Sequence, residues 1–203
     1  MLGCTGSGSW ADVIEGIDWV WVNSPGPSVA LMALGGVRSP AVDAATSNLV
    51  ASGVFVAVCG GSSNTDACNF SPAGSPGAYA VIRTTSTDQS ASTNNYGSCV
   101  KLQAPGTSIP STWLNNGTNV ISGTSMAAAH VTGIAAMFLD AVNDAPSSVV
   151  AGWLSGGGDL RRADRRAPAL AEPAALHQPH LTLSRTRQPS AQPSGQPLWA
   201  LDG

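Results

Sequence analysis

Apolar positions in the first three quarters of the chain alternate between helical and strand-like spacing. In segment 10–23 the apolar residues recur at helical spacing, which predicts a helix with one apolar face: Val13, Ile17, Val20 and Trp21. Ser9 precedes this segment and can cap it by accepting a hydrogen bond from a free backbone N–H group. A second helix is predicted over 40–52, with Ser39 as its cap and Gly53 as its stop.

The predicted strands lie between and after these helices. Segments 28–34 and 54–58 are apolar runs that predict buried strands, and two shorter runs, 78–83 and 99–103, are further strand candidates. Strands that are apolar on both faces are typical of a parallel sheet covered by helices. A long helix is predicted from Thr124 through Leu139, whereas the polar stretch 84–96 is predicted to be a surface loop. The order of elements therefore predicts an α/β fold with a parallel sheet between helices.

The composition changes after residue 157. Only 10% of the residues are charged, and residues 1–157 hold three basic and eight acidic side chains. The other six basic residues are arginines in 158–203, a proline-rich segment that we expect to be disordered. Two interpretations of this segment stay open, a basic interaction tail or an out-of-frame translation. The net charge of −3 provides no field for phosphates, so we expect no nucleic-acid partner.

The cysteines indicate an oxidising compartment. None of the four lies at a spacing typical of zinc ligands, so disulfides are the better interpretation: Cys4, Cys59, Cys68 and Cys99. No signal peptide follows Met1, and no apolar run appears long enough to span a membrane. We therefore expect a secreted protein whose sequence here lacks its start, with no membrane partner.

One segment combines glycine, hydroxyl and small residues where the long helix should begin. Residues 121–130 are Ile-Ser-Gly-Thr-Ser-Met-Ala-Ala-Ala-His. Gly123 allows a sharp turn, and a helix N-terminus offers free N–H groups to developing negative charge. Ser125 is thus a candidate nucleophile beside part of an oxyanion hole. In isolation, Gly-Thr-Ser fits a simple helix cap better, so the surrounding sequence must decide.

The surrounding sequence resembles the subtilase family of serine peptidases, most closely its proteinase K and aqualysin group. Gly-Thr-Ser-Met-Ala followed by His-Val and a glycine resembles the nucleophile motif of that family. The likeness extends over about residues 1–154 through motifs at 6–8, 17–20, 34–36, 67–72, 95–100 and 104–106. It implies the carboxy-terminal half of a subtilisin-like catalytic domain, with residues 1–157 forming a partial domain.

The resemblance implies a serine endopeptidase with an Asp/His/Ser triad in which Ser125 is the nucleophile. In the family the aspartate and histidine motifs lie upstream of the part matched here, and this chain contains neither. His130 falls within the same helix as Ser125, and His177 and His180 fall in the divergent tail. We therefore expect no triad-level activity from this chain alone. The alternative function is a non-catalytic subtilase-like module that binds peptides.

The resemblance also implies the substrate-binding residues, all of which lie in two strand ends and one glycine-rich turn: Gly6, Ser7, Gly8, Ala33, Leu34, Gly35, Gly60 and Gly61. Ser62 stands where the family has the asparagine of the oxyanion hole. A serine hydroxyl is a shorter donor than an asparagine amide, and losing such a donor typically lowers turnover by about 100- to 1000-fold. Ser62 is therefore a weak oxyanion-hole candidate.

The remaining expectations also follow from the resemblance. Cys68 and Cys99 match a disulfide pair, Cys4 matches a half-cystine whose partner lies upstream, and Cys59 has no counterpart, so we expect it to be a small buried apolar residue. Lys101 replaces an aspartate that binds calcium in several members, so we expect no calcium there and no other metal or cofactor. The expected partner is a peptide or protein substrate, and the expected state is a monomer.

Overall fold

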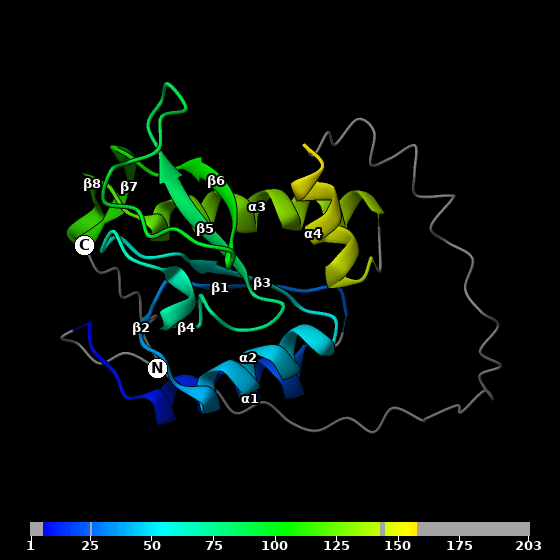
Figure 1. Cartoon of the computed structure of the whole chain (residues 1–203). Coiled ribbons are helices and arrows are strands. Elements are labelled where there is room, and N and C mark those ends of the chain that lie inside the picture. Colours follow the sequence, from blue (N-terminus) through cyan, green and yellow to red (C-terminus); the bar gives the residue numbers. More distant parts are fainter. Residues whose placement is uncertain (1–5, 25, 143–144, 158–203) are drawn as a thin grey trace, which may run out of the picture.

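A computed structural model describes residues 6–24, 26–142 and 145–157. These residues form three layers, in which a parallel sheet lies between two pairs of helices (Figure 1). The predicted tail at 158–203, Cys4, His177 and His180 lie outside the described residues.

In chain order the elements are α1 (Trp10–Asn23), β1 (Val29–Met32), β2 (Gly36–Val37), α2 (Pro40–Ala51), β3 (Phe55–Cys59), η1 (Ala67–Asn69), β4 (Phe70–Ser71), β5 (Tyr79–Thr84), β6 (Val100–Pro105), β7 (Ile109–Trp113), η2 (Leu114–Asn116), β8 (Gly117–Ile121), α3 (Thr124–Val142) and α4 (Ser147–Ser155).

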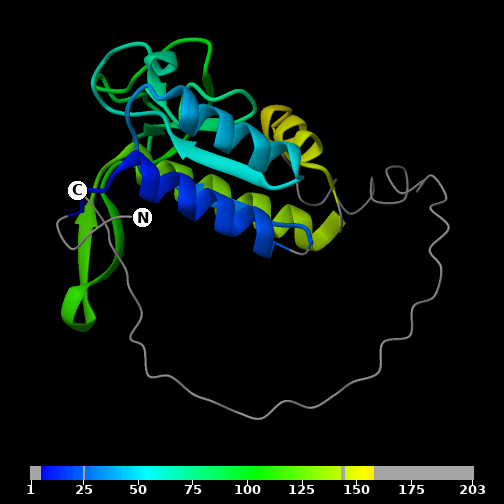
Figure 2. The same cartoon turned by 90° about the horizontal axis from the view of Figure 1, so that it is seen from below.

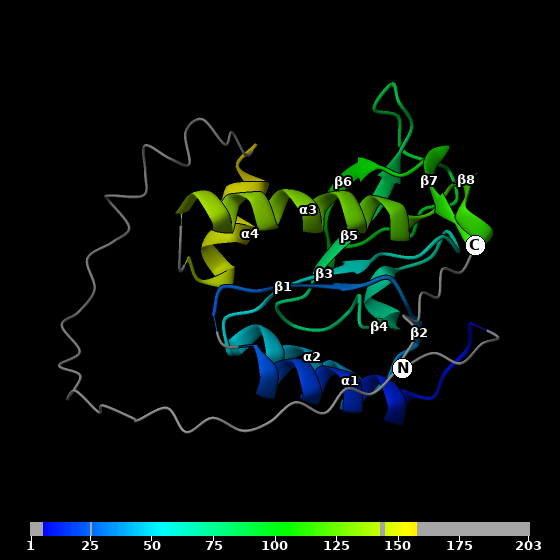
Figure 3. The same cartoon turned by 180° about the vertical axis from the view of Figure 1, so that it is seen from behind.

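The main sheet has the strand order β1-β3-β5-β6, and every neighbouring pair is parallel. Side chains alternate between its two faces, and both faces are buried. Phe55, Ala57 and Tyr79 pack under α3 and α4, whereas Val56 and Val58 pack against α1 and α2. Figure 3 shows the same arrangement from behind, with one pair of helices on each side of the sheet. The α/β architecture predicted from the apolar runs is confirmed.

Local capping signals explain where the first two helices begin. Ser9 and Asp12 form a capping box, in which the Ser9 hydroxyl accepts from the Asp12 N–H at 3.2 Å and the Asp12 carboxylate accepts from the Ser9 N–H at 3.1 Å. Ser39 caps α2, which has Pro40 as its first residue. Gly53 follows α2 with a φ of 104°, a left-handed conformation that suits glycine. These predicted helix boundaries are confirmed.

Three predictions about burial were wrong in part. The strand in 28–34 is not fully buried, because β1 lies at the edge of the sheet and Leu31 is 42% exposed. Trp21 is 55% exposed, since the face of α1 that meets the core is centred on Val13 and Ile17. The stretch 84–96 is not all surface loop. Thr84 is the last residue of β5, and Asn95, near the end of the stretch, is buried.

Two small antiparallel sheets were not predicted. The pair β2–β4 joins Gly36 to Ser71, and the hairpin β7–β8 joins residues 109–113 to 117–121. The hairpin projects from the body below the three layers in the view of Figure 2. Its strands mix polar and apolar residues and contain no fully buried side chain, so the apolar-run signal that located the main sheet was absent there.

Helix α3 is long and apolar enough to cross a membrane by length and composition, which the sequence analysis did not anticipate. In the structure one face of this helix lies on the main sheet. Its buried residues include Ala127, Val131, Ala135 and Phe138, which belong to the same core as Phe55. The apolar residues of this buried face are therefore explained by its place over the sheet, whereas Ile134 and Met137 of the same helix are exposed.

A disulfide links Cys68 in η1 to Cys99, directly before β6, over a sequence separation of 31 residues. This is the pairing that the family resemblance implied. The link ties the segment after β3 to the segment before β6, next to the bridge between Asp66 and Tyr96. In the chain-entropy model a loop of this size is worth about 3 to 4 kcal/mol of stability.

Candidate active site

The candidate site lies where β1 and β3 end. These parallel strands pair side by side, with Met32 opposite Val58, so their carboxyl ends open at the same edge of the sheet. The predicted substrate-lining segments Ala33–Gly35 and Gly60–Gly61 follow directly. Ligands of open α/β sheets bind at this edge.

Ser125 lies at this edge, in the first turn of α3. Its hydroxyl is half-buried and donates to the Ala33 carbonyl at 3.5 Å. The N-terminus of α3 carries free N–H groups and the positive end of the helix dipole. The structure thus joins the candidate nucleophile to one of the two predicted substrate-lining strand ends.

Backbone contacts fix the start of α3. The Gly123 N–H donates to the Gly106 carbonyl at 2.9 Å, and the Thr124 hydroxyl accepts from the Gly61 N–H at 3.1 Å. Gly106 belongs to the Ala-Pro-Gly motif and sits tightly between β5 and α3: an added Cβ would lie 2.7 Å from the Gly123 carbonyl oxygen. These contacts position Ser125 relative to the glycine turn after β3.

The turn that carries Ser62 is organised by Asn95. Its side-chain oxygen accepts from the N–H groups of Ser63 at 2.9 Å and Thr65 at 3.3 Å, and its amide donates to the Gly60 carbonyl at 2.9 Å. Asn95 is 1% exposed. In the sequence Asn95 stands out only as the first residue of the motif at 95–100. The further signal that could have indicated its role is that it forms an asparagine pair with Asn94.

Ser62 itself is exposed in this turn. It follows Gly61, whose N–H donates to the Thr124 hydroxyl at the start of α3. Ser62 is therefore the chain neighbour of a residue that contacts the start of α3. Its role as a weakened oxyanion donor stays a prediction. Gly61 has a φ of 92°, and an added Cβ would clash with the Asn95 amide nitrogen, so this glycine is required by both conformation and space.

The segment after β1 is held from several sides. The Cys59 thiol donates to the Leu34 carbonyl at 3.3 Å. Gly36 pairs with Ser71 in β4, and its Cα faces the indole of Trp10, which lies 2.9 Å from an added Cβ. Trp10 begins α1 and is separated only by the cap Ser9 from Gly6–Gly8, the other predicted substrate-lining segment. Leu34 is half-buried, whereas Ala33 and Gly35 are exposed.

Cys59 is not the simple apolar residue that the sequence predicted. It is a free cysteine at the end of β3, its side chain is hydrogen-bonded, and it neighbours the hydroxyls of Ser125 and Thr124. Burial raises the pKa of the Cys59 thiol, and the neighbouring hydroxyls of Ser125 and Thr124 offset only part of that effect.

We expect alkylation of Cys59 by iodoacetamide to require a higher pH than alkylation of a free cysteine peptide. The thiolate is the reactive form, and a raised pKa shifts its appearance to higher pH. The measurement is the pH profile of the labelling rate in a Cys4→Ser variant, with Cys59→Ser as the unlabelled control. A profile that rises at or below the pH of the free peptide would contradict the raised pKa.

In the described part of the chain the Ser125 hydroxyl forms no hydrogen bond with an imidazole or a carboxylate. His130 lies five residues further along α3, about 140° around the helix axis at 3.6 residues per turn. Its Nδ1 is 2.9 Å from the Met126 carbonyl oxygen of the same helix, and the side chain is exposed. That His130 does not act as the base stays a prediction.

Lys101 lies on β6, where its ammonium donates to the Ser98 carbonyl at 3.2 Å. Within 6–24, 26–142 and 145–157, no group of three or more His, Cys, Asp and Glu side chains could hold a metal ion. Asp66 accepts from the Cys68 N–H at 2.9 Å and caps η1. The absence of calcium at Lys101 stays a prediction.

Comparison with known proteins decides the family. A sequence model of the subtilase family of peptidases matches residues 2–155. The chain belongs to the subtilase family. A solved structure of a cold-adapted subtilisin-like serine proteinase superposes on 77% of this chain with a TM-score of 0.75 and 47% sequence identity. The fold expected from the resemblance is thereby confirmed.

Two curated relatives carry protease names. This subtilase is 52% identical over 139 residues to "Alkaline serine exoprotease A" of Vibrio alginolyticus, which covers 68% of this chain. It is 50% identical over 156 residues to "Extracellular serine proteinase" of Thermus sp. (strain Rt41A), which covers 76% of this chain. The chain spans 26% and 38% of the lengths of these relatives, and 57% of the solved structure.

Proposed function

We propose that this chain carries the nucleophile of a serine endopeptidase, with Ser125 forming an acyl-enzyme when the complete catalytic machinery is present. The observation that carries the proposal is the placement of Ser125. Its hydroxyl lies at the N-terminus of α3 and beside the Ala33 carbonyl, at the edge where β1 and β3 end. The family match and the protease names of the relatives support it.

The chemistry follows from this geometry. An external imidazole takes the Ser125 proton, the Oγ attacks the peptide carbonyl carbon, and the leaving amine departs with that proton. Water then hydrolyses the ester and regenerates the hydroxyl. Free N–H groups at the start of α3 stabilise the oxyanion, and Ser62 supplies a weaker donor than asparagine would. Backbone groups of Ala33–Gly35 and Gly6–Gly8 pair with the extended substrate.

This chain holds neither the aspartate nor the histidine motif of the triad, so we propose that it is inactive alone. A serine without a base keeps a high pKa and is a poor nucleophile. The second candidate function, a peptide-binding module without catalysis, is favoured by Ser62 and Lys101 standing where the family resemblance expects asparagine and aspartate.

We further propose that the protein is a secreted monomer that acts on peptides or proteins and binds no calcium at Lys101. The extracellular relative and the disulfide support secretion.

The test of the proposed function uses a longer form of this chain, extended at its amino end by a segment that carries the aspartate and histidine motifs. We expect it to cleave a chromogenic peptide amide, and we expect Ser125→Ala to lower the turnover number by about a millionfold. Ser111→Ala, an exposed serine in β7, is the matched control and should keep full activity. A longer form that binds the peptide without cleaving it would favour the non-catalytic function, and activity that survives Ser125→Ala would exclude Ser125 as the nucleophile.

A further inference from the structure

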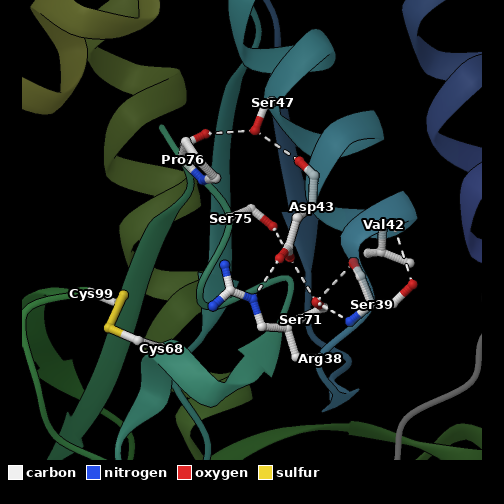
Figure 4. Close-up of polar contacts among 10 residues, drawn as sticks. All are labelled: Arg38, Ser39, Val42, Asp43, Ser47, Cys68, Ser71, Ser75, Pro76 and Cys99. Atoms are coloured by element: carbon white, nitrogen blue, oxygen red, sulfur yellow. Dashed lines mark hydrogen bonds and ion pairs between the residues drawn. A yellow bond between two sulfur atoms is a disulfide. The ribbon is translucent and has the colours of Figure 1, made fainter.

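A buried carboxylate lies behind the candidate site and takes no part in the chemistry above. Asp43, in the first turn of α2, is 6% exposed. Its Oδ1 accepts from the hydroxyls of Ser71 at 2.6 Å and Ser75 at 2.8 Å, and its Oδ2 accepts from Arg38 Nε at 3.0 Å. Figure 4 shows these groups converging on the carboxylate: Arg38 from the residues between β2 and α2, Ser71 from β4, and Ser75 from the segment after β4.

Ser71 connects this carboxylate to the substrate-lining segment. While its hydroxyl donates to Asp43, it accepts from the Ser39 N–H at 2.9 Å. Its backbone pairs with Gly36 between β4 and β2, and its carbonyl oxygen lies 3.5 Å from an added Cβ at Gly35. Arg38 comes directly after β2. Gly36 of β2, through Ser71, and Arg38, which follows β2, are thus linked to Asp43.

We propose that Asp43 is a positioning residue of the candidate active site: through Ser71 and Arg38 it fixes the segment Ala33–Gly36, whose Ala33 carbonyl meets the Ser125 hydroxyl. This inference rests on the proposed function, because it assigns a purpose to the same substrate-lining segment. A carboxylate in the first turn of a helix also stabilises that helix through its dipole. That effect alone requires neither buried serine contacts nor a link to β2.

The protonation state of Asp43 is consistent with this role. Burial by itself raises the pKa of this carboxyl group, but the hydrogen bonds from Ser71, Ser75 and Arg38 outweigh it, so the pKa lies below its ordinary value. The carboxylate therefore stays ionised at neutral pH and accepts all three hydrogen bonds. An asparagine would keep the oxygen that accepts from the serines but would turn an amide donor toward Arg38.

The test measures binding of a fluorescein-labelled alanine tetrapeptide amide to the 203-residue chain, with Ser125→Ala in every variant so that no peptide is cleaved. We expect Asp43→Asn and Ser71→Ala to weaken binding by about tenfold, because a loosened support displaces the segment that pairs with the peptide. Arg38→Gln, at a largely exposed side chain, should fold normally and weaken binding by about twofold to threefold.

Thr46→Val is the matched control. Thr46 lies on the same helix as Asp43, is fully buried, and its hydroxyl has no hydrogen-bond partner among the described residues. Its peptide affinity should equal that of the parent chain. Equal affinity in Asp43→Asn, Ser71→Ala and Arg38→Gln, measured well below their unfolding temperatures, would overturn the positioning role.

Hydrogen exchange separates this inference from the proposed function. If the parent chain binds no peptide, peptide binding at this site is contradicted, and amide exchange across residues 33–39 decides about Asp43. Faster exchange there in Asp43→Asn than in Thr46→Val, with unchanged exchange in α3, would support the positioning role. Unchanged exchange across 33–39 would overturn it.

Discussion

Replacing Gly106 by alanine is expected to destabilise the fold by about 3 kcal/mol or more, because overpacking a rigid site forces backbone displacement. A Cβ at this position would lie 2.6 Å from the Cβ of Arg83, 2.7 Å from the Gly123 carbonyl oxygen and 3.0 Å from the Cβ of Ala127. All three atoms belong to backbone or to the root of a side chain, so none can rotate away. Since domains of this size are stable by only about 5 to 15 kcal/mol, the loss is a large fraction of the total.

The measurement is urea unfolding of the 203-residue chain and its variants followed by circular dichroism. Gly133→Ala is the matched control, because Gly133 lies within α3 and an added Cβ there meets no atom within 4 Å. That substitution should leave stability unchanged or raise it by up to about 1 kcal/mol, since alanine is the better helix former. Equal stability of Gly106→Ala and the parent chain would show that β5, α3 and Gly106 do not pack as described.

Asn95→Ala is expected to cost about 3 kcal/mol and to loosen the turn that carries Ser62. The substitution removes three hydrogen bonds and leaves the N–H groups of Ser63 and Thr65 and the Gly60 carbonyl without their partner. Leaving a buried polar group unpaired costs about 1 to 3 kcal/mol. We expect peptide affinity to fall together with stability, because Gly60 and Gly61 belong to the predicted substrate-binding set.

Urea unfolding and peptide titration of the same samples test this expectation. Asn69→Ala is the control, since Asn69 is exposed in η1, close in sequence to the same turn. Its stability should change by no more than about 0.5 kcal/mol. Unfolding of Asn95→Ala at the same urea concentration as Asn69→Ala would contradict the stabilising role of the three Asn95 hydrogen bonds.

Much of the main architecture was predictable because its signals are local. The caps at Ser9 and Ser39 and the stop at Gly53 act within a few residues, so sequence shows them directly. The run 54–58 is apolar at every position because β3 lies between two strands and two helix layers. Ser125 was located by a motif whose position, at a helix start that follows a glycine, has a physical reason.

The rest depends on contacts between distant segments. Asn95 and Gly60 are 35 residues apart, and Asp43 and Ser71 are 28 apart, so no local pattern reveals that they meet. Whether a strand is central or at an edge also depends on what pairs with it, which is why Leu31 of β1 was predicted to be buried. In the sequence Cys59 resembles one more apolar position, whereas in the structure its thiol donates to the Leu34 carbonyl, 25 residues away.

We propose that this chain holds the nucleophile of a subtilase site but not its base. The most direct measurement is hydrolysis of a peptide p-nitroanilide by the purified 203-residue chain and by its Ser125→Ala variant. We predict that neither releases nitroaniline above the rate in buffer. Turnover by the chain that is abolished by Ser125→Ala would contradict the claim, because it would require a base within these 203 residues.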